Sequence, residues 1–179
     1  DLAGAWFTIF TSMFLHANWL HIGGNMLYLW IFGNNIEDTL GHIGFLVFYL
    51  VCGAAAAVAH ITTGPTSDIP TIGASGAVAG VMGAYFVLFP HARVLSIVPL
   101  GCFVTLAEVP ALIIIGLWAV LQFLNVSLLG GGELRGGGVA YAAHAGGFMV
   151  GMAIILMLGG QRLLYKRRAR QSTGYGDDW

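Results

Sequence analysis

Residues 73–91, GASGAVAGVMGAYFVLFPH, give the clearest indication of the fold. An apolar run begins at Ser75 and ends at Phe89, because Pro90 follows. As a helix this run would be about 22 Å long at ~1.5 Å per residue, which is shorter than the ~30 Å hydrocarbon core of a bilayer. If its end marks the inner surface, Ser75 lies below the outer surface. The run therefore predicts a short membrane helix, preceded by a loop, residues 62–74, that dips into the membrane beside a water-filled cavity.

The composition of the whole chain supports a lipid environment. Of the 179 residues, 58% are apolar and 8% are charged, and the mean hydropathy is +0.83. Soluble domains carry about a quarter charged residues. The net charge of −1 and the absence of a basic stripe argue against nucleic-acid binding. Cys52 and Cys102 have neither metal-ligand spacing nor the pattern of a disulfide framework.

Four further apolar segments surround the short helix along the chain, at residues 19–36, 43–61, 109–129 and 139–158. Each is close to the ~20 residues that a spanning helix needs. The sequence therefore predicts an all-α polytopic membrane protein with five spanning helices. It forms one membrane domain over residues 1–160, and a polar cytoplasmic tail over residues 161–179.

Basic residues orient this predicted bundle. Six of the seven Lys and Arg residues fall on one side of the five-segment topology, and the exception is Arg135. Because cytoplasmic loops are enriched in Lys and Arg, that side should face the cytoplasm, together with the C-terminus. The start of the short helix, and the starts of the first and last segments, then face outward. The Gly/Ala-rich segments favour a bacterial inner membrane.

Four polar residues lie in the outer part of the predicted bundle. His21 and Asn25 are four residues apart and share one helix face. His144 lies one to two turns into the last segment, and Ser75 opens the short helix. Because polar groups in a bilayer are costly, these side chains should face the bundle interior or a cavity. Each also has a plainer explanation: Ser75 as a packing residue, His144 as a structural hydrogen-bond partner, and the His21–Asn25 pair as an interhelical hydrogen bond.

Small residues indicate which helices meet. The short helix carries Gly76, Gly80 and Gly83, and the last segment carries Gly147 and Gly151, spacings that let helix backbones approach closely. If these faces pack, a serine lies beside a histidine, which is the minimum for covalent acyl transfer. Free N–H groups at the helix start would stabilise an oxyanion. No Asp or Glu lies at this depth, so the residues predict a dyad rather than a triad.

The other histidines and the large side chains suggest no second site. His16, His42, His60 and His91 lie near segment ends and are expected at the membrane interface. None forms a zinc-ligand pair on one helix, so neither a metal nor another cofactor is expected. The bulky residues of segment 109–129 are interpreted as lipid-facing or as core surface; examples are Leu117, Trp118 and Phe123.

Four motifs together resemble those of the rhomboid family, in order and spacing over nearly the whole chain. They are residues 14–21 (FLHANWLH) followed by Asn25, residues 33–41 with Gly33, Glu37 and Gly41, residues 73–76 (GASG), and residues 143–147 (AHAGG) followed by Gly151. The resemblance implies an intramembrane serine protease that cleaves transmembrane helices of other proteins. It implies Ser75 and His144 as the catalytic dyad.

The resemblance also assigns supporting residues. It implies that His21 and Asn25 assist the Ser75 N–H group in the oxyanion hole, and that His16 is a structural loop histidine. Structural roles are likewise implied for the residues Glu37, Gly73, Gly147 and Gly151. The implied partners are transmembrane protein substrates and the lipid bilayer; the oligomeric state stays open.

The chain departs from the family pattern at two points. The family core has six helices, and the first is expected to precede residue 1. Many members carry a Tyr four residues after the nucleophile, stacked on the catalytic histidine, where this chain has Ala79. The sequence leaves two rival functions open. One is a catalytically inactive rhomboid-like protein that binds membrane clients, and the other is a small channel or transporter. The first rival typically lacks the Ser or the His, and the second usually shows paired charges or an inverted repeat.

Overall fold

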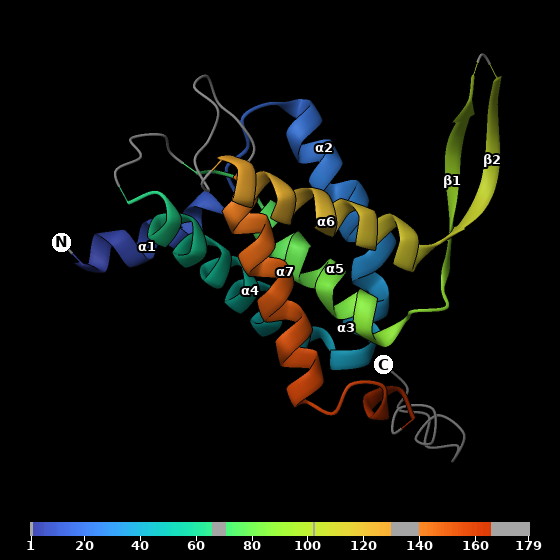
Figure 1. The fold of residues 1–179 in the computed structure, drawn as a ribbon. Helices are drawn as coiled ribbons and strands as arrows, with labels where there is room; N and C mark the ends of the chain where they lie inside the picture. The colour runs from blue at the N-terminus through green and yellow to red at the C-terminus, as the bar shows by residue number, and fades with distance from the viewer. Residues whose placement is uncertain (1, 66–70, 102, 130–139, 166–179) are drawn as a thin grey trace.

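A computed structural model describes residues 2–65, 71–101, 103–129 and 140–165 (Figure 1). Seven α-helices, one π-helical turn and one pair of strands follow each other along these residues. Their bounds are α1 Leu2–Ser12, α2 Trp19–Tyr28, π turn Leu29–Gly33, α3 Asn34–Leu40, α4 His42–Thr63, α5 Ser75–Leu88, β1 Arg93–Leu100, β2 Phe103–Pro110, α6 Ala111–Leu129 and α7 Tyr141–Met157.

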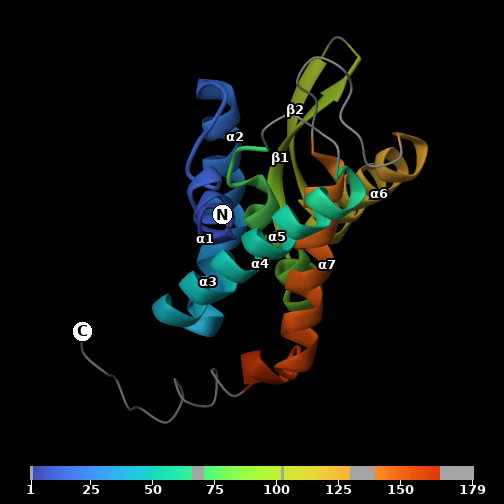
Figure 2. The same cartoon turned by 90° about the vertical axis from the view of Figure 1, so that its left-hand side faces the viewer.

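Helix α5 forms the centre of the bundle. Every residue from Gly76 to Tyr85 is buried, although the helix is short. Its neighbours are α4, α6, α7 and the π turn, and Figures 1 and 2 show α5 among these elements in both views. A helix that is apolar all round is stable only where it is surrounded. The short apolar run at residues 75–89 therefore forms the core of the fold.

Glycines let α5 and α7 touch backbone to backbone. A Cβ atom at Gly147 would collide with the carbonyl oxygen of Gly76, and one at Gly151 with that of Gly80. In the reverse direction, a Cβ atom at Gly83 would collide with the carbonyl oxygen of Phe148. This is the small-residue packing expected of membrane helices, and it fixes how the start of α5 lies against the start of α7.

The prediction of five spanning helices is not confirmed. Within the described residues, two helices are long and apolar enough to cross a membrane, α4 and residues 111–128 of α6. The helices α5 and α7 are shorter apolar helices. The segment predicted at residues 19–36 is divided into α2, a π-helical turn and α3. A π turn adds a residue to the helical repeat and changes which side chains share a face.

The all-α prediction is wrong for residues 93–110. These residues form an antiparallel hairpin in which Arg93 pairs with Pro110 and Leu100 with Phe103. The hairpin stands away from the helices (Figures 1 and 2), and Ile97 and Phe103 are about three-quarters exposed. Gly101 has φ +65°, which suits a tight hairpin turn. Residues 90–108 lie between two predicted helices, where no element was expected, although their β-branched residues favour strands.

Candidate functional site

Ser75 and His144 form a direct hydrogen bond. The Oγ atom of Ser75 lies 2.8 Å from Nε2 of His144. The serine is the first residue of α5 and the histidine lies in the first turn of α7, so the glycine packing of the two helices brings them together. Ala74 precedes the helix without a side-chain cap. The first N–H groups of α5 therefore have no intrahelical acceptor beside the Ser75 hydroxyl.

Gly73 shapes the approach to the serine. Its φ of +119° lies in a region that side-chain-bearing residues rarely adopt, and its N–H donates to the carbonyl oxygen of Ser12 at 2.9 Å. A Cβ atom at this position would lie 2.6 Å from Cε1 and 2.8 Å from Nε2 of His21. Both the backbone conformation and the close contact with the imidazole require a glycine here.

The side chains of His21 and Asn25 lie against this same turn. The Nδ2 atom of Asn25 is 3.7 Å from the Cβ position of Gly73. Asn25 is buried, and its Nδ2 donor has no hydrogen-bond partner within the part of the chain that the structure describes. His16 contacts His21 edge to face, with ring centroids 5.2 Å apart. Two α2 side chains with N–H donors are thus next to the residues that lead into Ser75.

Two residues at the site were missed by sequence reasoning, Gln122 and Trp118 of α6. The Oε1 atom of Gln122 lies 2.9 Å from Nδ1 of His144. The ring centroid of Trp118 lies 5.7 Å from that of His144, with 34° between the ring planes. The interpretation of Trp118 as lipid-facing or core surface left out this contact. An amide one turn after a tryptophan, in a helix whose first eleven residues carry no polar side chain except the indole N–H, was the available signal.

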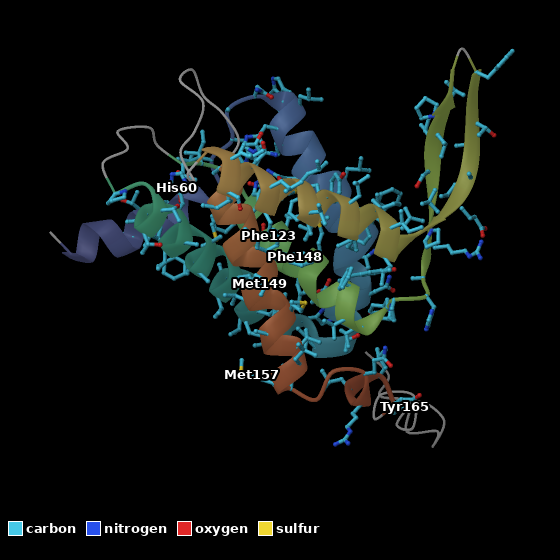
Figure 3. The ribbon with its side chains drawn as sticks, in the orientation of Figure 1. His60, Phe123, Phe148, Met149, Met157 and Tyr165 are labelled. Atoms are coloured by element: carbon cyan, nitrogen blue, oxygen red, sulfur yellow. The ribbon has the colours of Figure 1, made fainter. Side chains whose placement is uncertain are left out.

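A pocket opens beside the serine. It has a volume of about 520 Å³ and is lined by Ser75 and Gly76, by the loop residues Thr71–Gly73, and by parts of α1 and α4. His60 lies near the end of α4 (Figure 3) and also lines it. His60 was expected near a segment end and lies in the last turn of α4, where it is buried. Across the described ranges of the chain, neither of its ring nitrogens has a hydrogen-bond partner, and the same holds for the buried Oγ1 atom of Thr71.

The remaining predicted residues lie away from the pocket. Glu37 accepts a 2.7 Å hydrogen bond from His42 across the turn at Gly41, so it joins α3 to α4. Gly147 and Gly151 lie in the α5–α7 contact. Among the described residues, no three His, Cys, Asp or Glu side chains are grouped as metal ligands would be. The site that this geometry offers is a serine, a histidine and nearby N–H donors.

Comparisons with known proteins agree in one family. A family profile described as Rhomboid domain matches residues 3–161. Rhomboid protein 1, mitochondrial, of Saccharomyces cerevisiae is 34% identical over 149 residues, which are 81% of this chain and 40% of that protein. Rhomboid-like protein 11, chloroplastic, of Arabidopsis thaliana is 29% identical over 86% of this chain and 53% of that protein. Rhomboid protease GluP of Bacillus subtilis is 32% identical over 78% of this chain and 26% of that protein.

The lengths and names of these relatives bear on how much of each protein the chain matches and on its expected location. The chain spans 26% to 53% of their lengths, so it corresponds to part of each. Two are named for mitochondria or chloroplasts, so the expected bacterial inner membrane is not supported. The profile match covers most of the chain, including all four motifs and the Ser75–His144 pair. This chain belongs to the rhomboid family.

Proposed function

We propose that this chain is an intramembrane serine endopeptidase that cleaves transmembrane segments of membrane proteins through a Ser75–His144 dyad. The 2.8 Å contact between Oγ and Nε2 carries the proposal, because a nucleophile within hydrogen-bond reach of a base is the arrangement that activates serine. Membership of a family that includes a relative named as a protease supports it.

The chemistry follows from the atoms in contact. As Ser75 Oγ attacks the carbonyl carbon of the scissile peptide bond, Nε2 of His144 takes the hydroxyl proton. The carbonyl π electrons move to its oxygen, which becomes negative. On collapse the C–N bond breaks, and His144 returns the proton to the leaving amine. Water then attacks the acyl-serine ester by the same proton path and releases the second product.

The pocket offers a place for the substrate next to this serine. It is mostly apolar, but Thr71 and His60 carry buried polar atoms along it that have no partner in residues 2–65, 71–101, 103–129 and 140–165. Unpaired buried polar groups cost free energy unless something satisfies them. A peptide whose helix has unwound has free backbone groups of its own, and it would pair with these atoms on entry. Such a peptide is the substrate class that the pocket favours.

The oxyanion would be held by N–H groups at the start of α5, by Asn25 and by His21. Removing one such donor typically costs about 10²–10³ in rate. We therefore expect Asn25→Ala or His21→Ala to lower kcat by that order, while a fluorophosphonate still labels Ser75. Cleavage of a fluorogenic transmembrane substrate in liposomes gives kcat, and in-gel fluorescence gives labelling. Wild-type kcat in both variants would show that α2 does not line the site.

The proposed function itself is tested by reconstituting the full chain in liposomes with a single-pass substrate. Cleavage within the substrate's transmembrane segment, unaffected by EDTA, is the expected result. EDTA sensitivity that zinc reverses would contradict a metal-free serine mechanism. A client-binding protein without activity would retain the substrate intact and show no fluorophosphonate labelling, which would favour the rival function.

The topology predicted from the basic residues can be checked by cysteine labelling. We expect the end of α4 and the residues after α7 to lie on opposite sides of the membrane. Thr63→Cys and Arg162→Cys, each in a chain whose Cys52 and Cys102 are replaced by alanine, would be treated with an impermeant maleimide before and after lysis. Modification of both from the same side would contradict the predicted arrangement.

A further inference from the structure

Both ring nitrogens of His144 are occupied, and only one of them meets Ser75. The other, Nδ1, lies 2.9 Å from Oε1 of Gln122. Gln122 projects from α6 and is buried, with 7% of its surface exposed. A buried amide in an apolar membrane helix is costly unless it is hydrogen-bonded, so its position calls for a role.

The amide of Gln122 is held in one orientation. Its Nε2 atom donates to the carbonyl oxygen of Trp118, one turn earlier on α6, at 3.2 Å. Turning the amide over would place its oxygen against that carbonyl oxygen, and two acceptors repel. The oxygen of Gln122 therefore faces His144, and an amide oxygen can only accept a hydrogen bond.

This orientation determines which nitrogen of His144 carries the proton. Nδ1 must be the donor, since its partner is an acceptor. In the neutral ring, Nε2 then carries a lone pair, and it is Nε2 that lies 2.8 Å from Ser75 Oγ. A base must have that lone pair to take the serine proton. In the opposite tautomer, Nε2 would carry a hydrogen directed at the hydroxyl, so it could not accept the serine proton.

The tryptophan that accepts the amide hydrogen bond also limits the tilt of the ring. The Trp118 ring lies beside His144, and its other neighbour is Phe148, with ring centroids 6.1 Å apart. Phe148 is buried midway along α7 (Figure 3). One turn of α6 thus supplies an acceptor for Nδ1 and an aromatic ring against the imidazole, at a site where Ala79 offers neither.

We propose that Gln122 is the positioning residue of the site, fixing the tautomer and orientation of His144 in place of the carboxylate of a triad. The proposal rests on the proposed Ser75–His144 function. A neutral amide holds the ring without supplying a negative charge to stabilise the imidazolium that forms. Its contribution therefore lies in the chemical step and not in substrate binding.

Three variants separate positioning from packing. Gln122→Met keeps the length of the side chain without an acceptor. Gln122→Glu keeps an acceptor for Nδ1, and its protonated form can also donate to the Trp118 carbonyl. The control is Asn125→Leu on the same helix, where the exposed amide donates to the Leu121 carbonyl oxygen at 2.7 Å.

The expected result is a split between kcat and KM. Loss of a partner that orients a metal-ligating histidine typically costs about 10–100-fold in affinity or activity, and an effect of the same order is expected for a histidine base. We expect kcat of Gln122→Met to fall by that amount with KM and the melting temperature unchanged, Gln122→Glu to recover most of it, and Asn125→Leu to match the wild type. Wild-type kcat in Gln122→Met, a Gln122→Glu variant no better than Gln122→Met, or a change in KM alone would overturn the proposal.

A measurement independent of activity distinguishes this proposal from the dyad. Long-range ¹H–¹⁵N spectra of the histidine-labelled chain, with His144 assigned by its loss in His144→Gln, report which ring nitrogen is protonated. The Nδ1–H form is expected in the wild type and a mixture in Gln122→Met. A wild-type chain that neither cleaves nor labels would refute the dyad alone, whereas an Nε2–H form or a mixture in the wild type would refute the role of Gln122.

Discussion

Replacing Ser75 with alanine is expected to reduce cleavage by about 10⁵–10⁶-fold, because loss of the nucleophile or of its base removes the covalent route altogether. His144→Ala should cost about as much, since the two residues act as one unit through their 2.8 Å contact. The double variant should be no worse than either single one. Initial rates with the reconstituted substrate, measured over hours for the variants, provide the comparison.

The control for this prediction is a serine whose hydroxyl bonds to the backbone of its own helix. Ser127 of α6 donates to the Phe123 carbonyl oxygen at 3.0 Å, and Ser127→Ala should cleave at the wild-type rate. Thermal unfolding of Ser75→Ala should match the wild type, because the change removes one hydroxyl. Cleavage by Ser75→Ala within tenfold of the wild type would exclude the serine as nucleophile.

The largest expected effect on stability comes from Gly147→Leu. The Cβ atom of the new side chain would collide with the Gly76 carbonyl oxygen, and a backbone oxygen cannot shift as easily as the end of a flexible side chain. Overpacking typically costs 1–3 kcal/mol and occasionally more, so we expect a loss of about 3 kcal/mol. Because the same contact holds α7 against α5, separating the helices should also remove Ser75 labelling.

A matched glycine separates this effect from a general intolerance of leucine. A Cβ atom at Gly23 in α2 meets nothing within 4 Å, so Gly23→Leu should leave the melting temperature and labelling near wild-type values. Differential scanning fluorimetry in detergent measures both variants side by side. If Gly147→Leu had the same melting temperature as Gly23→Leu and the wild type, the α5–α7 contact would be looser than described.

The helices were predictable because apolar runs carry a strong signal. The run at residues 75–89 became α5, Ser75–Leu88, and segment 43–61 became α4, His42–Thr63. The hairpin was missed because most of residues 93–110 lie between two such runs, and short strands without a regular alternation give a weak signal. The π turn at Leu29–Gly33 leaves the hydropathy of its segment unchanged, so periodicity alone does not reveal it.

The site was predictable in part, for reasons that its residues make clear. Ser75, His144 and the glycines carry their own signal, since polar and small residues stand out in apolar helices. Gln122 was not predicted because the third member of a triad is usually a carboxylate, and because the family pattern points to position 79 for the group beside the histidine. Its contact with His144 depends on how α6 lies against α7, and apolar pattern does not specify that geometry.

Mapping the covalent adduct of a fluorophosphonate probe tests whether Ser75 is the nucleophile and His144 is its base. The full chain in liposomes would be treated with the probe, digested, and its modified peptide sequenced by mass spectrometry, with His144→Ala treated in parallel. One adduct is expected, on Ser75, and it should be lost when His144 is replaced. An adduct on another residue in a chain that cleaves its substrate, or undiminished labelling of Ser75 without His144, would contradict this assignment.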